Sequence, residues 1–589
     1  MMMTSTHPTG SDPASPFPGP RPKETIQDII VSVVIAFTLA FVFRGFVVEA
    51  FVIPTGSMAP TLMGAHERIR SPETGYTWPV GPWYAASGTD NEYKPVQGKA
   101  PDLPLELHDP MTGEELIRKD VPRKSGDRIL VLKYLYMLME PTRFDVIVFK
   151  CPYKPADNFI KRLVGLPGEE LAIVDGDIFF RPAPTPDSRM HNPDGSLKNP
   201  WADSDWKIAR KPQQVQDATW QTVFNSDFAP RGSVVSVNNT FASPWTSDQS
   251  AWKLDGRRFQ YPSSDATELV WDSNKPRLRF RYHSPYPEIS SFDDFWEIND
   301  RYAYNETPQT SFQHQIMRGG PFRPFFPVSD IRMSAGIEPA APGLSVTATI
   351  AARSHEFQMV IAGSTCSLRM RHVRDPDYKT VAQATISELS PGDVTNLQFV
   401  HVDQSLQAWI NGRKVAAADY NWGPDERIRM ATQSTVDELL KRENGSGLDG
   451  DLASMKNIFE ERSIYQKPRI SWTFSGAPVT MHRVRVDRDL HYTSTLMPQS
   501  GVPSRGSTPK KPILLGKDQF FVCGDNSPAS HDARVWDAPD PWVQQIDPTP
   551  GVVPRKLILG KAFFVYYPAP TWVYGRIPVP DFGRMRFIW

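Results

Sequence analysis

Residues 158–180, with the sequence NFIKRLVGLPGEELAIVDGDIFF, carry the strongest structural signals in this 589-residue chain. They contain an apolar segment around Lys161, a Pro-Gly turn, and two apolar runs separated by Asp175-Gly176. An Asp-Gly pair between two apolar runs is a strong hairpin signal, because both residues tolerate the positive φ that a tight turn requires. The stretch therefore predicts a strand around Lys161 and an antiparallel hairpin over residues 170–180.

Short strands are expected on both sides of this stretch. Residues 127–135 (DRILVLKYL) and 145–151 (DVIVFKC) precede it, and residues 518–526 (DQFFVCGDN) and 561–568 (KAFFVYYP) lie near the far end of the chain. Each is a short apolar run bracketed by turn residues, which is typical of strands. We interpret the two groups as one β domain that is interrupted by a large insertion.

This interpretation divides the chain into segments. The β domain comprises residues 49–180 and 505–589, and its first part contains a smaller polar insertion at residues 65–124 that we leave unassigned. The large insertion begins with a linker-like segment at residues 181–214 and continues through residues 215–495.

Residues 215–495 repeat short strand-and-turn units, and Asn411-Gly412 between two alternating runs is a type I′ hairpin signature. Regular short strands of this kind predict a β-sandwich. The pairing of residues 396–415 (NLQFVHVDQSLQAWINGRKV) with a late strand at residues 482–492 (HRVRVDRDLHY) resembles the jelly rolls of the concanavalin and laminin-G type. That resemblance implies either a carbohydrate or protein ligand for the insertion, or a role as an inert spacer.

The N-terminal region is expected to anchor the chain in a membrane. Residues 1–25 form a tail rich in Pro, Ser and Gly that we expect to be disordered. Residues 26–48 are predominantly apolar, and Arg44 within them can extend its charge to the bilayer interface, so one membrane-spanning helix is expected. A cleaved signal peptide and a buried core helix are the alternatives. Arg21 and Lys23 favour a cytoplasmic N-terminus and place the remaining chain on the extracytoplasmic side.

Composition excludes several other classes of function. A net charge of −1 gives no electrostatic reason to expect nucleic acid as a partner. The twelve histidines show no HExxH spacing, so we expect neither a metal site nor a cofactor. Cys151, Cys366 and Cys523 are odd in number and lack CxxC spacing, and buried free thiols are expected.

Two residues carry the chemical signal. Ser57 lies in FVIPTGSMAPTL (51–62), directly after the expected membrane span, on a loop that its prolines make rigid. Lys161 is flanked by apolar residues such as Phe159 and Leu163, and burial would lower its pKa until the neutral amine can act as a base near neutral pH. Taken alone, each has an ordinary interpretation as a turn serine or a strand-edge lysine.

The two residues do not occur alone. Together with GDRILVLKY, RFDVIVFKCP and GDNSPASHDARVW (524–536), in this order after one apolar span, their segments resemble the type I signal peptidase family. The match covers about residues 50–64, 126–180 and 514–567. It implies a mainly β protein, with an antiparallel β catalytic domain behind one N-terminal transmembrane helix and, here, an inserted β-sandwich. It also implies a serine endopeptidase of the cytoplasmic membrane that removes signal peptides from exported precursor proteins after small residues.

The resemblance assigns a role to each matched residue. Ser57 corresponds to the nucleophile and Lys161 to its general base, while the Thr55 hydroxyl and the Ser57 N–H correspond to the oxyanion hole. The residues that orient the base or form a buried charge network are Ser530, Asp525, Asp532, Arg162 and Arg534. The apolar residues that line the substrate pockets are Phe51, Ile53, Leu62 and Ile160.

Three alternatives to this assignment exist. His531 beside Asp532 suggests a Ser-His-Asp triad, but Lys161 already supplies a base. A binding module on an inactive peptidase frame would not need the dyad and its supporting residues together, and a self-cleaving repressor would need an N-terminal DNA-binding domain. The expected partners are precursor proteins and membrane lipid. If the insertion has its own core, its replacement by a linker should leave some cleavage of a simple peptide.

Overall fold

The computed structural model describes most of the chain and divides it into two units, Met1–Glu49 and Ala50–Trp589, each of which is considered by itself. The described residues are 25–42, 45, 47–81, 84–86, 93–95, 105–113, 115–118, 123–184, 199–230, 234–236, 239–240, 243–255, 257–281, 291–305, 325–444, 457–493, 504–573 and 577–589.

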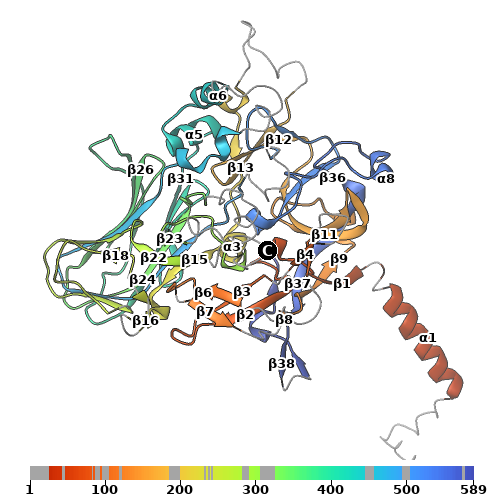
Figure 1. The fold of residues 1–589 in the computed structure, drawn as a ribbon, viewed down its shortest axis with the longest axis horizontal. Coiled ribbons are helices and arrows are strands. Elements are labelled where there is room, and N and C mark those ends of the chain that lie inside the picture. The colour runs from red at the N-terminus through yellow and green to blue at the C-terminus, as the bar shows by residue number, and fades with distance from the viewer. Residues whose placement is uncertain are drawn as a thin grey trace, which may run out of the picture. The chain divides into compact units, whose positions relative to one another are not determined.

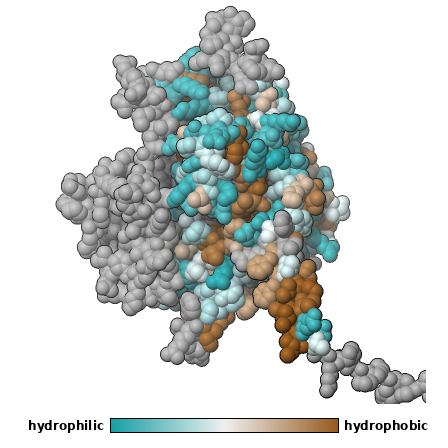
Figure 2. Space-filling view, turned by 90° about the vertical axis from the view of Figure 1, so that its right-hand side faces the viewer, coloured by the Kyte–Doolittle hydropathy of each residue, from teal (hydrophilic) through white to brown (hydrophobic). Residues whose placement is uncertain are grey.

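In the first unit the structure describes the helix α1 (Ile26–Val42), which has 17 residues. Thr25 and Asp28 cap its start reciprocally, because each backbone N–H is accepted by the other residue's side chain at 3.0 and 3.3 Å. Apolar side chains such as Phe37, Leu39 and Phe41 are 62–69% exposed, and Figure 2 shows the apolar surface of this helix. The helix is shorter than the span expected over residues 26–48, and no helix in the described ranges has the length and apolar character needed to cross a membrane.

The first sheet of the second unit combines strands from both ends of the sequence (Figure 1). Its neighbouring strands are, in order, β1 (Val48–Val52), β9 (Arg128–Leu132), β37 (Ile558–Tyr567), β10 (Val146–Cys151), β11 (Lys154–Gly165), β35 (Gln519–Cys523) and β36 (Val553–Pro554), with β40 (Arg586–Phe587) beside β37. Because β37 lies between β9 and β10, the two ends of the sequence form a single antiparallel sheet. The strands predicted around 145–151, 518–526 and 561–568 are all present.

The predicted Asp-Gly hairpin is confirmed. β12 (Glu169–Val174) pairs with β13 (Asp177–Pro182), and Asp175 and Gly176 turn between them with φ of 47° and 88°. β14 (Lys207–Ile208) and β34 (Ile513–Leu514) complete this four-stranded sheet. Within the segment expected to be linker-like, Trp201 and Trp206 are buried against the helices α5 (Pro424–Thr432) and α6 (Val436–Asn444), whereas residues 185–198 lie outside the described ranges.

The small insertion at residues 65–124 contributes further β structure. β2 (His66–Arg70) lies between β3 (Thr77–Val80) and β8 (Arg123–Lys124) in a three-stranded sheet. Paired two-stranded elements are β4 (Tyr84–Ala86) with β5 (Tyr93–Pro95), β6 (Leu105–His108) with β7 (Glu115–Arg118), and, near the far end, β38 (Thr571–Val573) with β39 (Ile577–Val579). Short helices α2 (Leu135–Leu138) and α8 (Pro541–Gln544) connect strands of the first sheet.

Two large antiparallel sheets form the sandwich expected in the large insertion, on the left of Figure 1. One contains β19 (Lys253–Leu254), β20 (Arg258–Tyr261), β33 (Val479–Arg488), β24 (Ile331–Pro339), β29 (Thr395–Val402), β30 (Ser405–Ile410) and β31 (Arg413–Asp419), with β15 (Gln221–Asn225) beside β33. The other contains β18 (Trp245–Thr246), β21 (Thr267–Trp271), β32 (Arg469–Ser475), β25 (Ser345–Ala352), β26 (His355–Ala362), β27 (Thr365–His372) and β28 (Lys379–Thr385). The remaining elements are β16 (Val234–Ser236) with β17 (Asn239–Thr240), β22 (Pro276–Arg281) with β23 (Ser291–Phe295), and α3 (Gln213–Thr219).

The sandwich has its own apolar core because its strands alternate. In β25 every second residue is buried, and Ile350 of this strand shares one cluster with Trp472 of β32 and with Phe399 of the opposite sheet. The predicted turn at Asn411-Gly412 is confirmed, with φ of 48° and 78° between β30 and β31. The late strand β33 pairs with β24, which separates it from β29.

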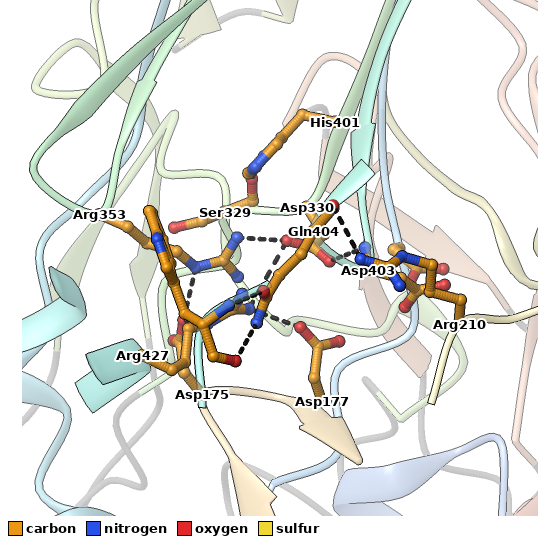
Figure 3. Close-up of polar contacts among 12 residues, drawn as sticks. Asp175, Asp177, Arg210, Ser329, Asp330, Arg353, His401, Asp403, Gln404 and Arg427 are labelled. Carbon is orange, nitrogen blue, oxygen red and sulfur yellow. Dashed lines mark hydrogen bonds and ion pairs between the residues drawn. The ribbon is translucent and has the colours of Figure 1, made fainter. Parts of the chain in front are cut away.

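A buried group of charged residues joins the β12–β13 turn to the sandwich (Figure 3). We call it the junction cluster, and its members are Asp175, Asp177, Lys211, Asp330, Arg353, Asp403, Arg427 and Asp489. Arg353 donates to Asp175 at 2.7 Å and to Asp330 at 2.5 Å. Arg427 donates to Asp175 at 2.9 Å and to Asp177 at 2.5 Å. Lys211 pairs with both Asp403 and Asp489.

Carboxylates outnumber cations in the junction cluster, so the pKa values of some carboxyl groups are raised and those of others are lowered. Burial and the nearby Asp330 carboxylate raise the pKa of Asp177 to about 7, despite Arg427. Burial, opposed by Lys211 and reinforced by Asp489, raises the pKa of Asp403 to about 6. Burial would also raise the pKa of Asp330, but the adjacent Arg353 and Arg427 outweigh it and lower that pKa. The cluster therefore holds protons at mildly acidic pH that the unfolded chain releases.

This arrangement predicts how stability depends on pH. The Asp177 carboxyl group has a pKa of about 7 in the folded chain and about 4 in the unfolded chain, so the folded state binds its proton more tightly. Its contribution to stability is complete below about pH 4 and is lost as the pH rises through 7. We expect the free energy of unfolding to fall by about 1 kcal/mol per pH unit between pH 5 and 7. In Asp177→Asn, which keeps an oxygen for Arg427 but cannot titrate, this slope should be smaller.

Denaturant unfolding at several pH values would measure both slopes. The exposed Asp393→Asn is the matched control and should behave like the unmodified chain. Equal slopes for Asp177→Asn and the unmodified chain would show that Asp177 does not hold the proton.

Candidate active site

Ser57 lies in a single 3-10 turn, Gly56–Met58, that follows β1 directly. Met58 is completely buried in an apolar cluster with Ile53 and Leu62, which fixes the turn to the first sheet. Thr55 precedes the turn with an extended backbone, and its side chain is exposed and forms no capping bond to the turn. The hydroxyl groups of Thr55 and Ser57 therefore lie on the accessible side of a turn whose other side is packed.

Lys161 approaches this turn from the interior of β11, where it is paired with Ile147 of β10. Its side chain is only 4% exposed, and Nζ donates a hydrogen bond to Ser57 Oγ at 2.6 Å. Burial lowers the pKa of Lys161 to about 8, although the Asp532 carboxylate opposes this change. Because burial disfavours the ammonium form, a substantial fraction of the amine is neutral near neutral pH and can accept the Ser57 proton.

Two buried ion pairs flank the lysine. Arg162, the next residue of β11, points to the opposite face of the strand and holds Asp525 through two hydrogen bonds of 2.7 and 2.6 Å. Arg534 holds Asp532 in the same two-bonded manner, at 2.8 and 2.7 Å. All four side chains are inaccessible to solvent. The charge network expected from the resemblance thus consists of two separate pairs, with Asp532 assigned to Arg534.

The Asp532 carboxylate is the charge that acts most strongly on Lys161. Burial alone would raise the pKa of Asp532, but Arg534 and the N–H of Gly524, which donates to its Oδ2 at 2.8 Å, lower that pKa. Asp532 therefore stays ionised and limits how far the pKa of Lys161 falls. Desolvation and this fixed charge together set the proton affinity of the amine.

Ser530 and His531 are placed differently from each other. Ser530 is buried, but its Oγ has no hydrogen-bond partner in the described part of the chain, so its role in orienting the Lys161 amine stays a proposal. His531 bonds to the hydroxyl of Tyr153 at 3.1 Å, while Ser57 Oγ is engaged by Lys161. The geometry therefore favours a serine–lysine pair over a triad that includes His531.

The four residues expected to line substrate pockets belong to one apolar cluster. Phe51 and Ile160 are partly buried, whereas Ile53 and Leu62 are at most 3% exposed. Phe51 and Ile160 thus keep some accessible surface, whereas Ile53 and Leu62 keep almost none.

Four residues that contact the site were not identified from the sequence. Asn526 donates its backbone N–H to Ser57 O and its side-chain amide to Gly56 O, both at 3.0 Å. Tyr302, Tyr304 and Asn305 reach the same region from the large insertion. Asn526 stands between recognised residues of the closing motif and could have been noticed there. The other three lie in a stretch without periodicity or motif.

The described residues contain one group of carboxylates close enough to hold a metal ion. Oxygens of Asp177, Asp330 and Asp403 lie within 4.8 Å of one another in the junction cluster. Each of the three carboxylates is paired with one of the cations Arg427, Arg353 and Lys211, so the group is accounted for by ion pairs. The three cysteines are buried and free, as predicted.

Comparison with known proteins supports the family suggested by the motifs. Residues 122–243 and 467–567 match the family described as signal peptidase, peptidase S26. Signal peptidase I of Rickettsia typhi is 23% identical over 160 residues, which are 27% of this chain and 45% of that protein. Signal peptidase I of Aquifex aeolicus is 52% identical over 44 residues, which are 8% of this chain and 17% of that protein. The resemblance to the type I signal peptidase family is confirmed over these segments, and the chain spans less than half the length of either relative.

Solved structures resemble part of this chain only loosely. A carbohydrate-binding module, CBM66 of Bacillus subtilis, covers 42% of this chain and 96% of its own, with 7% identity and a TM-score of 0.21. A likeness this weak supports no argument about a ligand. The description of the sandwich rests on its own strand pairing.

The buried pair of Arg162 and Asp525 generates a prediction about stability. Arg162→Met leaves the Asp525 carboxylate buried without its partner, which should lower the free energy of unfolding by about 3–5 kcal/mol. Denaturant unfolding would measure this loss.

The double variant Arg162→Met/Asp525→Asn provides the matched control. It removes both charges and should recover part of the stability, because an unpaired buried charge costs more than no pair. A double variant that is less stable than Arg162→Met would show that the lone carboxylate is not the cause.

Proposed function

We propose that this chain, whose matched segments belong to the type I signal peptidase family, is a membrane-anchored serine endopeptidase that removes signal peptides from exported precursors. The observation that supports this most directly is the 2.6 Å contact between the buried Lys161 Nζ and Ser57 Oγ. The matched segments contain Lys161 and the closing motif with Asp525 and Asp532. Ser57 lies outside them, and its assignment depends on this contact.

In the proposed reaction, Ser57 Oγ attacks the carbonyl carbon of the scissile peptide bond while the neutral Lys161 amine takes the hydroxyl proton. The tetrahedral intermediate collapses when the C–N bond breaks, and the leaving amine receives that proton from Lys161. A water molecule then attacks the ester carbonyl, again with Lys161 as base, and Ser57 is regenerated. Each step uses one nucleophile and one base that the fold already holds in contact.

Two donors are proposed to stabilise the oxyanion of both tetrahedral intermediates. The Ser57 N–H belongs to the 3-10 turn, and the exposed Thr55 hydroxyl precedes it on an extended backbone. A donor that is fixed in place before the reaction stabilises the developing negative charge without reorganisation. Ser530 is proposed to orient the Lys161 amine once substrate is bound.

Specificity for small residues is proposed to arise from Phe51 and Ile160. They share an apolar cluster with Met58, the neighbour of Ser57, and with the buried Ile53 and Leu62, so we expect a bulky substrate side chain to be excluded there. Steric exclusion of this kind rejects large residues more effectively than it selects among small ones.

We propose that α1 provides the membrane anchor. Residues 29–41 carry no charge, and the described side chains among them, such as Ile29, Phe37 and Phe41, are exposed. A bilayer would bury this apolar surface at about 25 cal/mol per Å². The catalytic unit would then act on the extracytoplasmic side of the membrane, where precursors emerge.

Replacement of either member of the dyad should abolish cleavage. Ser57→Ala and Lys161→Met should each lower kcat for an exported precursor by at least about 10³-fold, because neither nucleophile nor base can be replaced by water. The double variant should be no worse than either single variant, since the two residues act as one unit. Cleavage would be followed by electrophoresis of the precursor with detergent-solubilised protein.

The exposed Lys414→Met is the matched control for Lys161→Met and should cleave normally. Near-normal cleavage by Ser57→Ala or by Lys161→Met would overturn the dyad assignment.

The proposed base predicts the pH profile. Because only the neutral amine accepts a proton, kcat/KM should rise with pH and level off above the lowered Lys161 pKa of about 8. A peptide substrate without titratable groups near the cut would isolate this effect. A rate that still climbs through about pH 10.4, the ordinary lysine value, would show that burial does not tune the amine.

A further inference from the structure

A short segment of the large insertion, Tyr302–Asn305, lies against the turn that carries Ser57. We call it the buttress segment, and it includes a 3-10 turn at Ala303–Asn305. Both of its tyrosines are 6% exposed. The segment is therefore packed between the sandwich and the first sheet, and each of its polar side chains contributes a separate contact.

Tyr302 connects the sandwich to the closing motif. Its hydroxyl donates to the backbone oxygen of Asp525 at 2.7 Å. On the other side, the guanidinium of Arg488, the last residue of β33, lies 4.7 Å from the centre of the Tyr302 ring and donates to Arg301 O at 2.8 Å. A cation held over an aromatic ring in a buried position stabilises the geometry of both groups. The buttress segment is thus fixed at its sandwich end.

Tyr304 covers the turn itself. A Cβ atom placed on Gly56 would lie 2.1 Å from the Tyr304 ring, so the ring rests directly on the backbone before Ser57. The Tyr304 hydroxyl donates to Ala65 O at 3.0 Å, and its backbone oxygen accepts from Gly81 at 2.7 Å. Together with Ala59 and Met63, Tyr304 forms a small apolar cluster under the turn. Gly56 is the residue that permits this close approach.

Asn305 holds the residue that bonds to the turn. The side-chain amides of Asn305 and Asn526 form a reciprocal pair, in which each donates to the other at 2.8 Å. The same Asn526 amide donates to Gly56 O, and the Asn526 backbone donates to Ser57 O, both at 3.0 Å. Because Asn526 is buried, its orientation depends on its partners, and Asn305 supplies two of its hydrogen bonds.

We propose that the insertion positions the nucleophile, with Asn305 and Tyr304 as positioning residues that hold the Ser57 turn in register with Lys161. Neither residue touches the reacting atoms, and both act through Gly56 and Asn526. The inference rests on the proposed function and extends it, because it makes the insertion part of the catalytic machinery. The contacts therefore argue against the expectation that a linker in place of the insertion would leave cleavage of a simple peptide.

The test compares Asn305→Ala with Asn396→Ala, a matched substitution at an exposed position of the sandwich. For a peptide substrate, Asn305→Ala should lower kcat by about 10–100-fold, the cost of displacing a reacting group by roughly 1 Å. KM should change less than about twofold, since the substrate pockets are not altered, and the thermal unfolding temperature should match that of Asn396→Ala. Tyr304→Phe, which keeps the ring over Gly56, should retain more activity than Tyr304→Ala.

A second measurement does not depend on cleavage. Hydrogen exchange of the peptide covering residues 54–63 should be faster in Asn305→Ala than in the unmodified chain, and unchanged in Asn396→Ala. If the unmodified chain cleaves no precursor, the proposed peptidase function fails, but the exchange rates still decide whether Asn305 positions the turn. Unchanged exchange together with unchanged kcat in Asn305→Ala would overturn the inference.

Discussion

The site depends on one constraint, which is that a lysine amine must lose its proton inside a protein and still face a serine hydroxyl. The burial of Lys161 in β11 lowers the pKa of its amine, because an ammonium ion that is removed from water is unfavourable. The same burial would make the fold unstable if the neighbouring charges were unpaired. The ion pairs of Arg162 with Asp525 and of Arg534 with Asp532 answer that requirement, since each charge has a two-bonded partner. The Asp532 carboxylate raises the pKa of Lys161, whereas desolvation lowers it. The pKa of the amine is therefore set by two effects of opposite sign.

Much of the fold could be predicted from local patterns. The turns at Asp175-Gly176 and Asn411-Gly412 are each encoded by two adjacent residues that accept a positive φ. The segments around Ser57 and Lys161 could likewise be recognised, because the residues that identify each segment are only a few positions apart in the sequence. Such features do not depend on the distant chain.

What could not be predicted depends on pairs of residues far apart in the sequence. The resemblance places Arg162 and Asp525 in one charge network, but only the fold shows that these two residues, 363 positions apart in the sequence, bond to each other. The contact of Tyr304 with Gly56 joins residues that no common motif contains. The junction cluster combines three hairpin turns, a strand start, a helix and three residues outside these elements, and each of its residues looks like an ordinary surface charge in the sequence.

The position of β37 in the first sheet has a consequence for biosynthesis. This strand, Ile558–Tyr567, lies between β9 and β10, which are synthesised some four hundred residues earlier. A ribosome adds roughly 5–20 residues per second, so the early strands wait on the order of a minute for their central neighbour. Contacts between residues so far apart in sequence also form slowly, because the entropy cost of closing a long loop comes before the contacts contribute any stabilisation. The sandwich, whose strands are nearer to one another in sequence, can collapse during that interval. The sheet that carries Lys161 is therefore complete only when nearly all of the chain has been translated, so the proposed pair of Lys161 and Ser57 is assembled late in synthesis.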